Sequence, residues 1–200
     1  VDSRGEFQHN LVLAGIRFFL LPRVRRQLAA EIRSQFEAFR QTGLPLDHVN
    51  AHNHMHLHPT VLTLVLKIGR EFGLRAVRLP YEPALSTGEG WRETIARFAL
   101  VPWIWLLKIR LRRAGIRCND YVFGLRDSSA MDEATVLRLL AQLPEGVSEM
   151  YFHPATRRCT ELDLSMPGYQ VEQELAALTS PAVRQTLERL GVTPIAFSEL

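Results

Sequence analysis

Residues 44–59 read LPLDHVNAHNHMHLHP, and the rest of the chain is organised around this stretch. Its first part, residues 45–50, has the apolar pattern of a short strand. Histidines then occupy alternate positions, His52, His54, His56 and His58. Pro59 disfavours a helical conformation in the residue before it and suits the first position of a helix. The stretch therefore predicts a strand, an extended histidine tract and then a helix.

The alternation of the histidines predicts that their side chains lie on one side of an extended chain. Neutral imidazole is the commonest metal ligand in proteins. Side chains spread evenly along one face do not all reach a single ion. We therefore expect one or two of the histidines to bind a metal ion, and the others to contact substrate or to hold the ligands in place. The alternative interpretation is a solvated histidine-rich tract.

The sequence on both sides of the tract predicts helices that alternate with strands. Pro22 opens a stripe of apolar residues at helical spacing that ends near Gly43, and Pro59 opens a helix that ends near Gly73. Residues 8–21 fit a short buried helix or a strand equally well. Further strands are expected at residues 75–80, 147–152 and 193–197, and a strand or ordered loop at 119–125. Further helices are expected at about 131–142 and 181–190, and a loop at 156–169. This order predicts an α/β fold with a parallel sheet or barrel.

The composition is typical of a globular protein, with 46% hydrophobic and 22% charged residues among 200. The net charge of +3 comes almost entirely from arginines that lie beside acids, a pattern that favours a solvated surface over a nucleic-acid site. Cys118 and Cys159 form no CxxC pattern, which predicts no disulfide and a reducing compartment. There is neither a signal-peptide pattern at the start nor a long uncharged apolar run. We expect a cytoplasmic protein, with peripheral contact at the inner membrane left open.

Residues 94–113 carry apolar side chains and a basic end. Trp103 and Trp105 lie among leucines and isoleucines, and the cations follow at Lys108, Arg110, Arg112 and Arg113. Tryptophan beside basic residues is typical of a helix at a membrane surface. A helix buried between domain and lid, with its basic ends reaching solvent, fits equally well. We predict a single domain over residues 1–200, with a helical lid or edge insertion at about 81–118.

A histidine also follows a second predicted strand. Residues 147–152 end at His153, which repeats the position of the tract behind residues 45–50. Functional groups gather at the carboxyl ends of strands in α/β folds. We therefore expect His153 to face the same cleft as His52, although a lone histidine is often only structural.

Two motifs resemble those of a known family. Residues 46–56, with Pro59 close behind, resemble the hLDSHxHxHxxP signature of the YdjC-like carbohydrate deacetylases. Residues 150–155 are similar to the CHPA motif of the same family, and the end of the strand at 78–80 also fits. Within the family the chain is most similar to the hopanoid-biosynthesis-associated branch called HpnK, over essentially all of its length.

The resemblance implies a (β/α) barrel of the glycoside hydrolase/deacetylase type and hydrolysis of a linear amide, the N-acetyl group of an amino sugar. It implies a divalent ion, Mg or Zn, which activates water and polarises the amide carbonyl. His52 would be a metal ligand, His153 would protonate the leaving amine, and His54, His56 and Arg78 would contact substrate. The implied partner is an N-acetylated sugar or glycolipid, such as a hopanoid-linked glucosamine, and a homodimer is left open.

The chain also departs from the family pattern. The opening ADDFG and middle GxH motifs are absent, and Asn50 and Ala51 replace the aspartate and serine of the signature. His52 alone does not hold a catalytic ion. We therefore expect an incomplete barrel without its first strands. It would be inactive or impaired, without a retained ion, if these residues are the whole polypeptide, and part of a deacetylase if they are a fragment. The alternatives are a soluble chito-oligosaccharide deacetylase and a non-catalytic sugar-binding remnant.

Overall fold

A computed structural model describes residues 10–83 and 91–200. The chain falls into two compact units. The described residues of the first unit are 10–78, 105–118 and 196–200, and those of the second are 79–83, 91–104 and 119–195.

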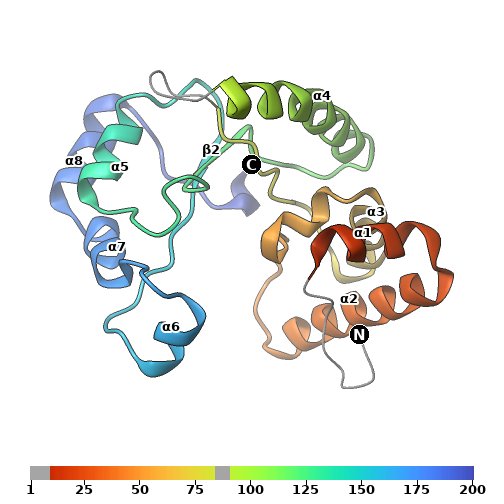
Figure 1. The fold of residues 1–200 in the computed structure, drawn as a ribbon. Helices are drawn as coiled ribbons and strands as arrows, with labels where there is room; N and C mark the ends of the chain where they lie inside the picture. Colours follow the sequence, from red (N-terminus) through yellow and green to blue (C-terminus); the bar gives the residue numbers. More distant parts are fainter. Residues whose placement is uncertain (1–9, 84–90) are drawn as a thin grey trace. The chain divides into compact units, whose positions relative to one another are not determined.

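In the first unit, helices α1 (Leu11–Leu20), α2 (Pro22–Gln41) and α3 (Pro59–Gly69) pack against one another (Figure 1). Asn10 caps α1, because its side chain accepts a hydrogen bond of 3.0 Å from the backbone N–H of Leu13. Prolines begin α2 and α3, as the sequence predicts. The short 3-10 helix η2 (Arg70–Phe72) follows α3 and ends at Gly73, whose φ of 79° suits glycine. The core of this unit includes Ile32, Phe36, Val61, Leu62, Val65, Leu66, Ile68, Leu74, Ala76 and Val77.

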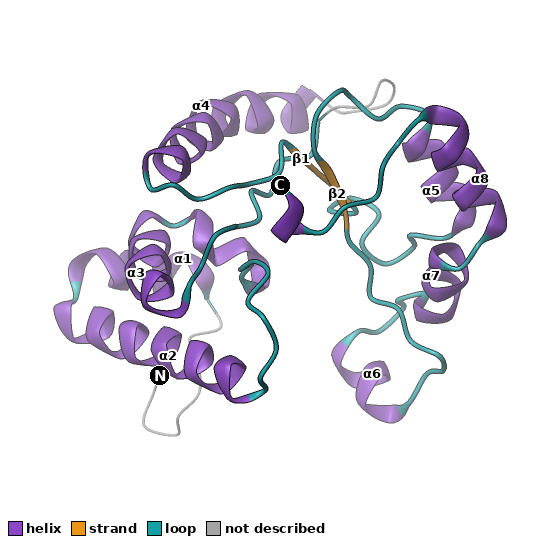
Figure 2. Cartoon of the chain, turned by 180° about the vertical axis from the view of Figure 1, so that it is seen from behind, coloured by secondary structure: helices purple, strands orange, loops and turns teal. Residues whose placement is uncertain are grey.

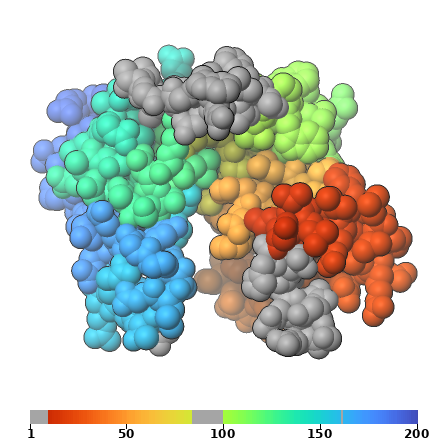
Figure 3. Space-filling view, in the orientation of Figure 1, coloured from red at the N-terminus to blue at the C-terminus, as the bar shows by residue number. Residues whose placement is uncertain are grey.

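Helix α1 buries a small residue and exposes most of its large apolar side chains. Ala14 is buried, and a Cβ added to Gly15 would lie 3.4 Å from Cδ2 of His58. The exposed apolar side chains in and after the helix are Leu11, Val12, Leu13, Ile16, Phe19, Leu20 and Leu21. Figure 3 shows α1, at the red end of the colour range, on the surface of this unit. An apolar surface of this kind favours association.

Short parallel pairings take the place of long strands in the first unit. Val49 pairs with Val77, and Ala76 pairs with Arg117, both in parallel. The N–H of Val49 donates to the Ala76 carbonyl over 3.1 Å, and the Val49 carbonyl accepts from the N–H of Arg78 over 3.0 Å. The strand predicted at residues 45–50 is thus reduced to one paired residue, while its predicted parallel direction is confirmed.

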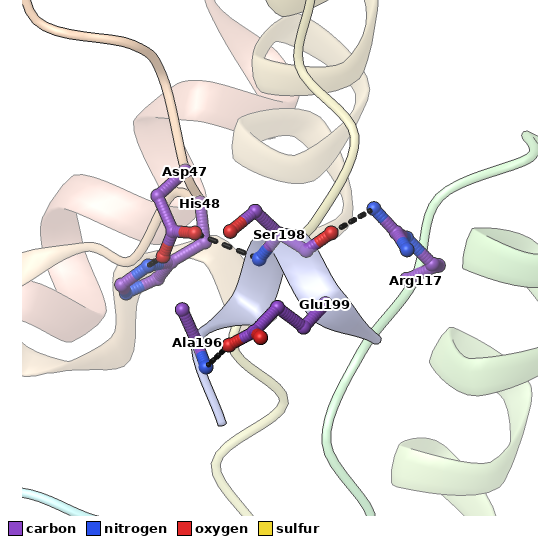
Figure 4. Close-up of polar contacts among 6 residues, drawn as sticks. All are labelled: Asp47, His48, Arg117, Ala196, Ser198 and Glu199. Atoms are coloured by element: carbon purple, nitrogen blue, oxygen red, sulfur yellow. Dashed lines mark hydrogen bonds and ion pairs between the residues drawn. The ribbon is translucent and has the colours of Figure 1, made fainter. Parts of the chain in front are cut away.

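The end of the chain is fixed beside this pairing (Figure 4). The Asp47 carboxylate lies 2.9 Å from Nδ1 of His48 and accepts a hydrogen bond of 2.7 Å from the backbone N–H of Ser198. The His48 ring stacks on Phe197 with 4.1 Å between ring centroids. Arg117 donates to the Ser198 carbonyl over 3.2 Å. These contacts hold the last residues as a short 3-10 helix, η3 (Phe197–Glu199).

In the second unit, strands β1 (Tyr121–Phe123) and β2 (Ser148–Met150) pair in parallel (Figure 2). Helix α5 (Glu133–Leu140) contacts α7 (Val171–Leu178) and α8 (Pro181–Leu190). The short helix α6 (Thr160–Ser165) precedes α7. Ser180 caps α8 through its hydroxyl, which accepts from the N–H of Ala182 over 3.1 Å. The core of this unit contains Phe123, Met131, Val136, Leu139, Leu140 and Ala177.

Helix α4 (Trp91–Arg113) is continuous and contains Pro102. It corresponds to the segment predicted at residues 94–113. Within residues 10–83 and 91–200, no helix combines the length and the apolar character that a membrane span needs.

The mixed α/β class predicted from the sequence is confirmed, whereas the incomplete barrel and the single domain with an insertion at about 81–118 stay predictions. Residues 11–20 adopt the helical alternative, but the helix is largely exposed instead of buried as predicted. The loop predicted at 156–169 is wrong where α6 forms. The strand predicted at 193–197 is also wrong, because side chains satisfy the backbone there. The N–H of Ala196 donates to Glu199 over 2.6 Å, and that of Ser198 donates to Asp47.

Asn119 joins two segments of the second unit. Its side chain is fully buried, and its Oδ1 accepts a hydrogen bond of 2.7 Å from the N–H of Leu79. Its Nδ2 donates to the carbonyls of Leu79 over 2.9 Å and of Tyr121 over 2.8 Å. One amide side chain thus satisfies both backbone groups of Leu79, as a neighbouring strand would.

We expect Asn119→Ala to lower the free energy of unfolding by roughly 1–3 kcal/mol, because the buried N–H of Leu79 would lose its partner while the Leu79 carbonyl keeps the N–H of Tyr81. Urea unfolding followed by circular dichroism measures the change. Gln173→Ala removes an exposed amide from the same unit and should change the free energy by less than about 0.5 kcal/mol. Equal, small changes for the two variants would show that the Asn119 bonds do not hold the unit together.

Candidate functional site

The histidine tract is a tight turn rather than an extended chain. Residues His52–Leu57 form the 3-10 helix η1, in which Asn53 and His54 have φ values of 49° and 53°. This left-handed backbone is uncommon outside glycine, although asparagine tolerates it. Alternate side chains share one face only in an extended chain, so the turn removes the common face predicted for the histidines. The predicted extended conformation is therefore wrong, and each histidine has its own surroundings.

His52 lines a cavity of about 800 Å³ within the first unit. It follows the pairing of Val49 with Val77 by three residues, and its side chain is exposed. The wall of the cavity is largely apolar and includes Leu11, Phe18, Ile32, Phe36, Val61 and Val65. His48, Asn50 and Asn53 add polar groups beside His52. Of the four histidines of the tract, His52 is among the described residues that line the cavity, and His54, His56 and His58 are not.

His56 is buried, with 2% of its surface exposed. Its Nε2 lies 2.8 Å from the backbone carbonyl of Arg78. Burial lowers the pKa of His56 to about 4, and the bond to the Arg78 carbonyl offsets only part of this effect. The neutral ring therefore donates Nε2–H to that carbonyl. This arrangement supports the turn from inside, and contact of His56 with substrate stays a prediction.

His58 connects the tract to two helices. Its Nδ1 accepts a hydrogen bond of 3.2 Å from the N–H of Thr60 and so caps α3. Its ring lies against Phe18 and Phe19 of α1, at centroid distances of 5.7 and 4.4 Å. Burial lowers the pKa of His58 below its usual value. The end of the tract is thus an anchor for α1 and α3.

His54 and Arg78 are half-buried. The His54 ring lies 6.3 Å from that of His56, measured between centroids. The backbone of Arg78 serves both Val49 and His56. The structure thus brings His54, His56 and Arg78 together around the turn, and substrate contact by the His54 and Arg78 side chains stays a prediction.

His153 belongs to the second unit, where it follows β2. The ring is half-buried and meets Tyr151 and Tyr169 edge-on, at centroid distances of 5.5 and 4.9 Å. Its backbone N–H donates to Oε2 of Glu174 over 2.5 Å. Sequence reasoning does not single out Glu174, because a glutamate at the start of a helix is usually solvated. The predicted approach of His153 to His52 stays a prediction, since the two residues belong to different units.

Comparison with known proteins places the chain in a family. The model of the family described as YdjC-like protein matches residues 1–189. The chain belongs to the YdjC-like protein family. This match bears out the resemblance in the histidine motif, while the HpnK branch stays a prediction.

Relatives in this family are named carbohydrate deacetylases. One from Brevibacillus brevis is 25% identical, covering 100% of this chain and 69% of its own length. One from Homo sapiens is 28% identical, covering 90% of this chain and 60% of its own length. The chain thus spans about two thirds of the length of these relatives.

The fold also matches a solved structure. A crystal structure of a proposed cellobiose-phosphate cleavage protein from Enterococcus faecalis V583 superimposes with a TM-score of 0.63 at 22% identity. The match covers 100% of this chain and 67% of the other. At this identity the similarity establishes the fold alone.

The described residues do not by themselves fit a catalytic metal ion. Such an ion is typically held by three protein ligands and keeps one open position. Within residues 10–83 and 91–200, no three His, Cys, Asp or Glu side chains come together in a metal-binding arrangement. His52 is therefore a single candidate ligand beside the cavity.

We expect the burial of His56 to make the stability of the protein depend on pH. The folded state binds this proton only near pH 4, whereas an unfolded histidine binds it near pH 6.5. The unfolded state therefore holds more protons between these values, and stability falls as the pH decreases through this window, by about 3 kcal/mol in total. Unfolding free energies measured from pH 7 to pH 4 should show a shallower slope for His56→Gln than for the unsubstituted protein. Identical slopes would contradict the buried neutral state.

Proposed function

We propose that this chain carries part of a metal-dependent carbohydrate deacetylase that removes the acetyl group from an amino sugar, with hopanoid-linked glucosamine as the preferred substrate. The observation that carries the proposal is the position of His52, directly behind the parallel pairing of Val49 and beside a cavity of about 800 Å³. The relatives named carbohydrate deacetylases support the reaction class.

The reaction needs a proton donor for its leaving group. Water adds to the carbonyl carbon of the acetamide and gives a proton to a general base, proposed to be an aspartate outside these 200 residues; the bond between that carbon and nitrogen then breaks, and acetate and an amine are released. An amine leaves readily only when its nitrogen is protonated. In this proposal the protonated His153 gives its proton to that nitrogen and ends as neutral imidazole. The half-buried ring behind β2 supports this role.

His52 is proposed as one ligand of a divalent ion, Mg or Zn. The other ligands are proposed to come from protein outside these 200 residues. The 60–69% share of the relatives' lengths that the chain spans supports this view. The incomplete barrel belongs to the same proposal and rests on the same comparison of lengths.

Two substitutions in the complete protein separate these roles. His52→Ala should lower both the metal content and the release of acetate from N-acetylglucosaminyl substrates, since it removes a ligand. His153→Ala should lower turnover by roughly 100-fold or more and leave the metal content unchanged, since it removes a proton donor. Gln35→Ala, a polar residue of the same cavity, is the control for His52.

Loss of metal in the His153 variant would instead make that residue a ligand. No acetate release from the metal-loaded protein would favour a sugar-binding remnant.

The exposed side of α4 supports a glycolipid substrate over a soluble sugar. Trp105 is 65% exposed and Leu106 is 49% exposed, while Leu107 and Leu111 are buried. Arg112 and Arg113 are exposed at the end of the helix. Arg110, in contrast, donates hydrogen bonds to Thr63 and Pro59 of α3, so we do not include its side chain in the proposed membrane contact. Exposed tryptophan next to cations suits the boundary of an anionic membrane.

We expect the complete protein to float with anionic liposomes in a density gradient, and replacing Trp105, Leu106, Arg112 and Arg113 with Ser and Gln to abolish flotation. Each cation near such a surface contributes about 1 kcal/mol, so high salt should weaken the binding. Lys67→Gln, which removes a cation from α3, is the matched control. Binding that survives the combined replacement would favour a soluble chito-oligosaccharide as substrate.

A further inference from the structure

Two buried polar atoms in neighbouring side chains of the second unit have no hydrogen-bond partner among the described residues: Nδ1 of His153 and Oε1 of Glu174. Glu174 is fully buried. Its other oxygen, Oε2, accepts the backbone N–H of His153 over 2.5 Å. Buried polar groups are nearly always paired, so two unpaired atoms at one place need an explanation. Each has what the other lacks, because Nδ1–H is a donor and a carboxylate oxygen is an acceptor.

The carboxylate is fixed in this place by the start of α7. Glu174 lies in the first turn of the helix, and its N–H donates to the Gln170 carbonyl over 2.9 Å. The N–H of Ala155 donates to the Val171 carbonyl over 3.0 Å, which ties the loop behind His153 to the same turn. A negative charge is favoured near the N-terminus of a helix. Glu174 is therefore held beside His153 as an acceptor with one unused oxygen.

We propose that Glu174 is a positioning residue for His153. A rotation of the imidazole brings Nδ1–H to Oε1 of Glu174, and this bond keeps a proton on Nδ1. Nε2 is then the atom that gives a proton to a substrate and takes one up. A carboxylate that orients a histidine in this way also stabilises the imidazolium form. The catalytic meaning of this bond rests on the proposed function, but the bond itself does not.

Nuclear magnetic resonance tests the bond without any measurement of activity. In the complete protein at a pH where the ring is neutral, the nitrogen shifts of His153 should report a proton on Nδ1. Glu174→Gln should move the ring toward the Nε2–H form that free histidine prefers. Glu172→Gln is the matched control, because Glu172 is exposed in the same turn and accepts from the N–H of Arg158 over 3.3 Å. A proton on Nε2 in the unsubstituted protein would overturn the proposal, even if the Glu174 variant fails to fold.

Kinetics test the positioning role. Glu174→Gln should lower kcat by roughly 10–100-fold with little change in KM, because the proton transfer depends on the ring orientation. In a His153→Ala background the same substitution should lower kcat by less than about twofold, because the imidazole that Glu174 positions is absent. Equal losses in both backgrounds would make Glu174 merely structural and overturn the proposal. An active His153→Ala variant would refute the proposed function and leave the tautomer result standing.

Discussion

The hydrogen bond between the buried imidazole of His56 and the carbonyl of Arg78 is the constraint on which the histidine tract depends. Arg78 follows Val77, which pairs with Val49. The bond therefore ties the tract to the segment that is paired with the one before the tract. A six-residue helix is too short to hold itself, and two of its residues have a left-handed backbone that costs energy. The buried His56 offsets this cost and leaves His52 beside the cavity.

The same principle recurs where the backbone lacks a strand partner. Strands β1 and β2 are three residues each, so many peptide groups near them are bonded by side chains. Asn119 serves Leu79, and Asp120 accepts the N–H of Val147 over 3.0 Å. Asp47 and Glu174 accept the N–H groups of Ser198 and His153 in the same way. These polar side chains are buried or half-buried. Each forms a hydrogen bond with a backbone group that a neighbouring strand would pair if the strands were longer.

The sequence predicts local features well and long-range ones poorly, for physical reasons. Pro22 and Pro59 mark helix starts and Gly73 marks an end, because these residues restrict or free their own backbone, and Ser180 marks a start because its hydroxyl caps α8. The course of the histidine tract depends instead on a bond from His56 to a carbonyl 22 residues away, which no local pattern encodes. The partnership of His153 with Glu174 spans 21 residues and is hidden for the same reason. The alternation of the histidines was therefore a poor guide to the geometry of the tract.

The histidines of the tract have different structural roles. His56 is neutral and inside, His58 caps α3 and packs against α1, and His52 lines the cavity. His58 packs against Gly15, Phe18 and Phe19 of α1, so the end of the tract helps to hold this helix. A substitution in the tract can change both the side chain that lines the cavity and the packing of α1. Loss of activity in such a variant therefore identifies a metal ligand only when α1 is shown to stay in place.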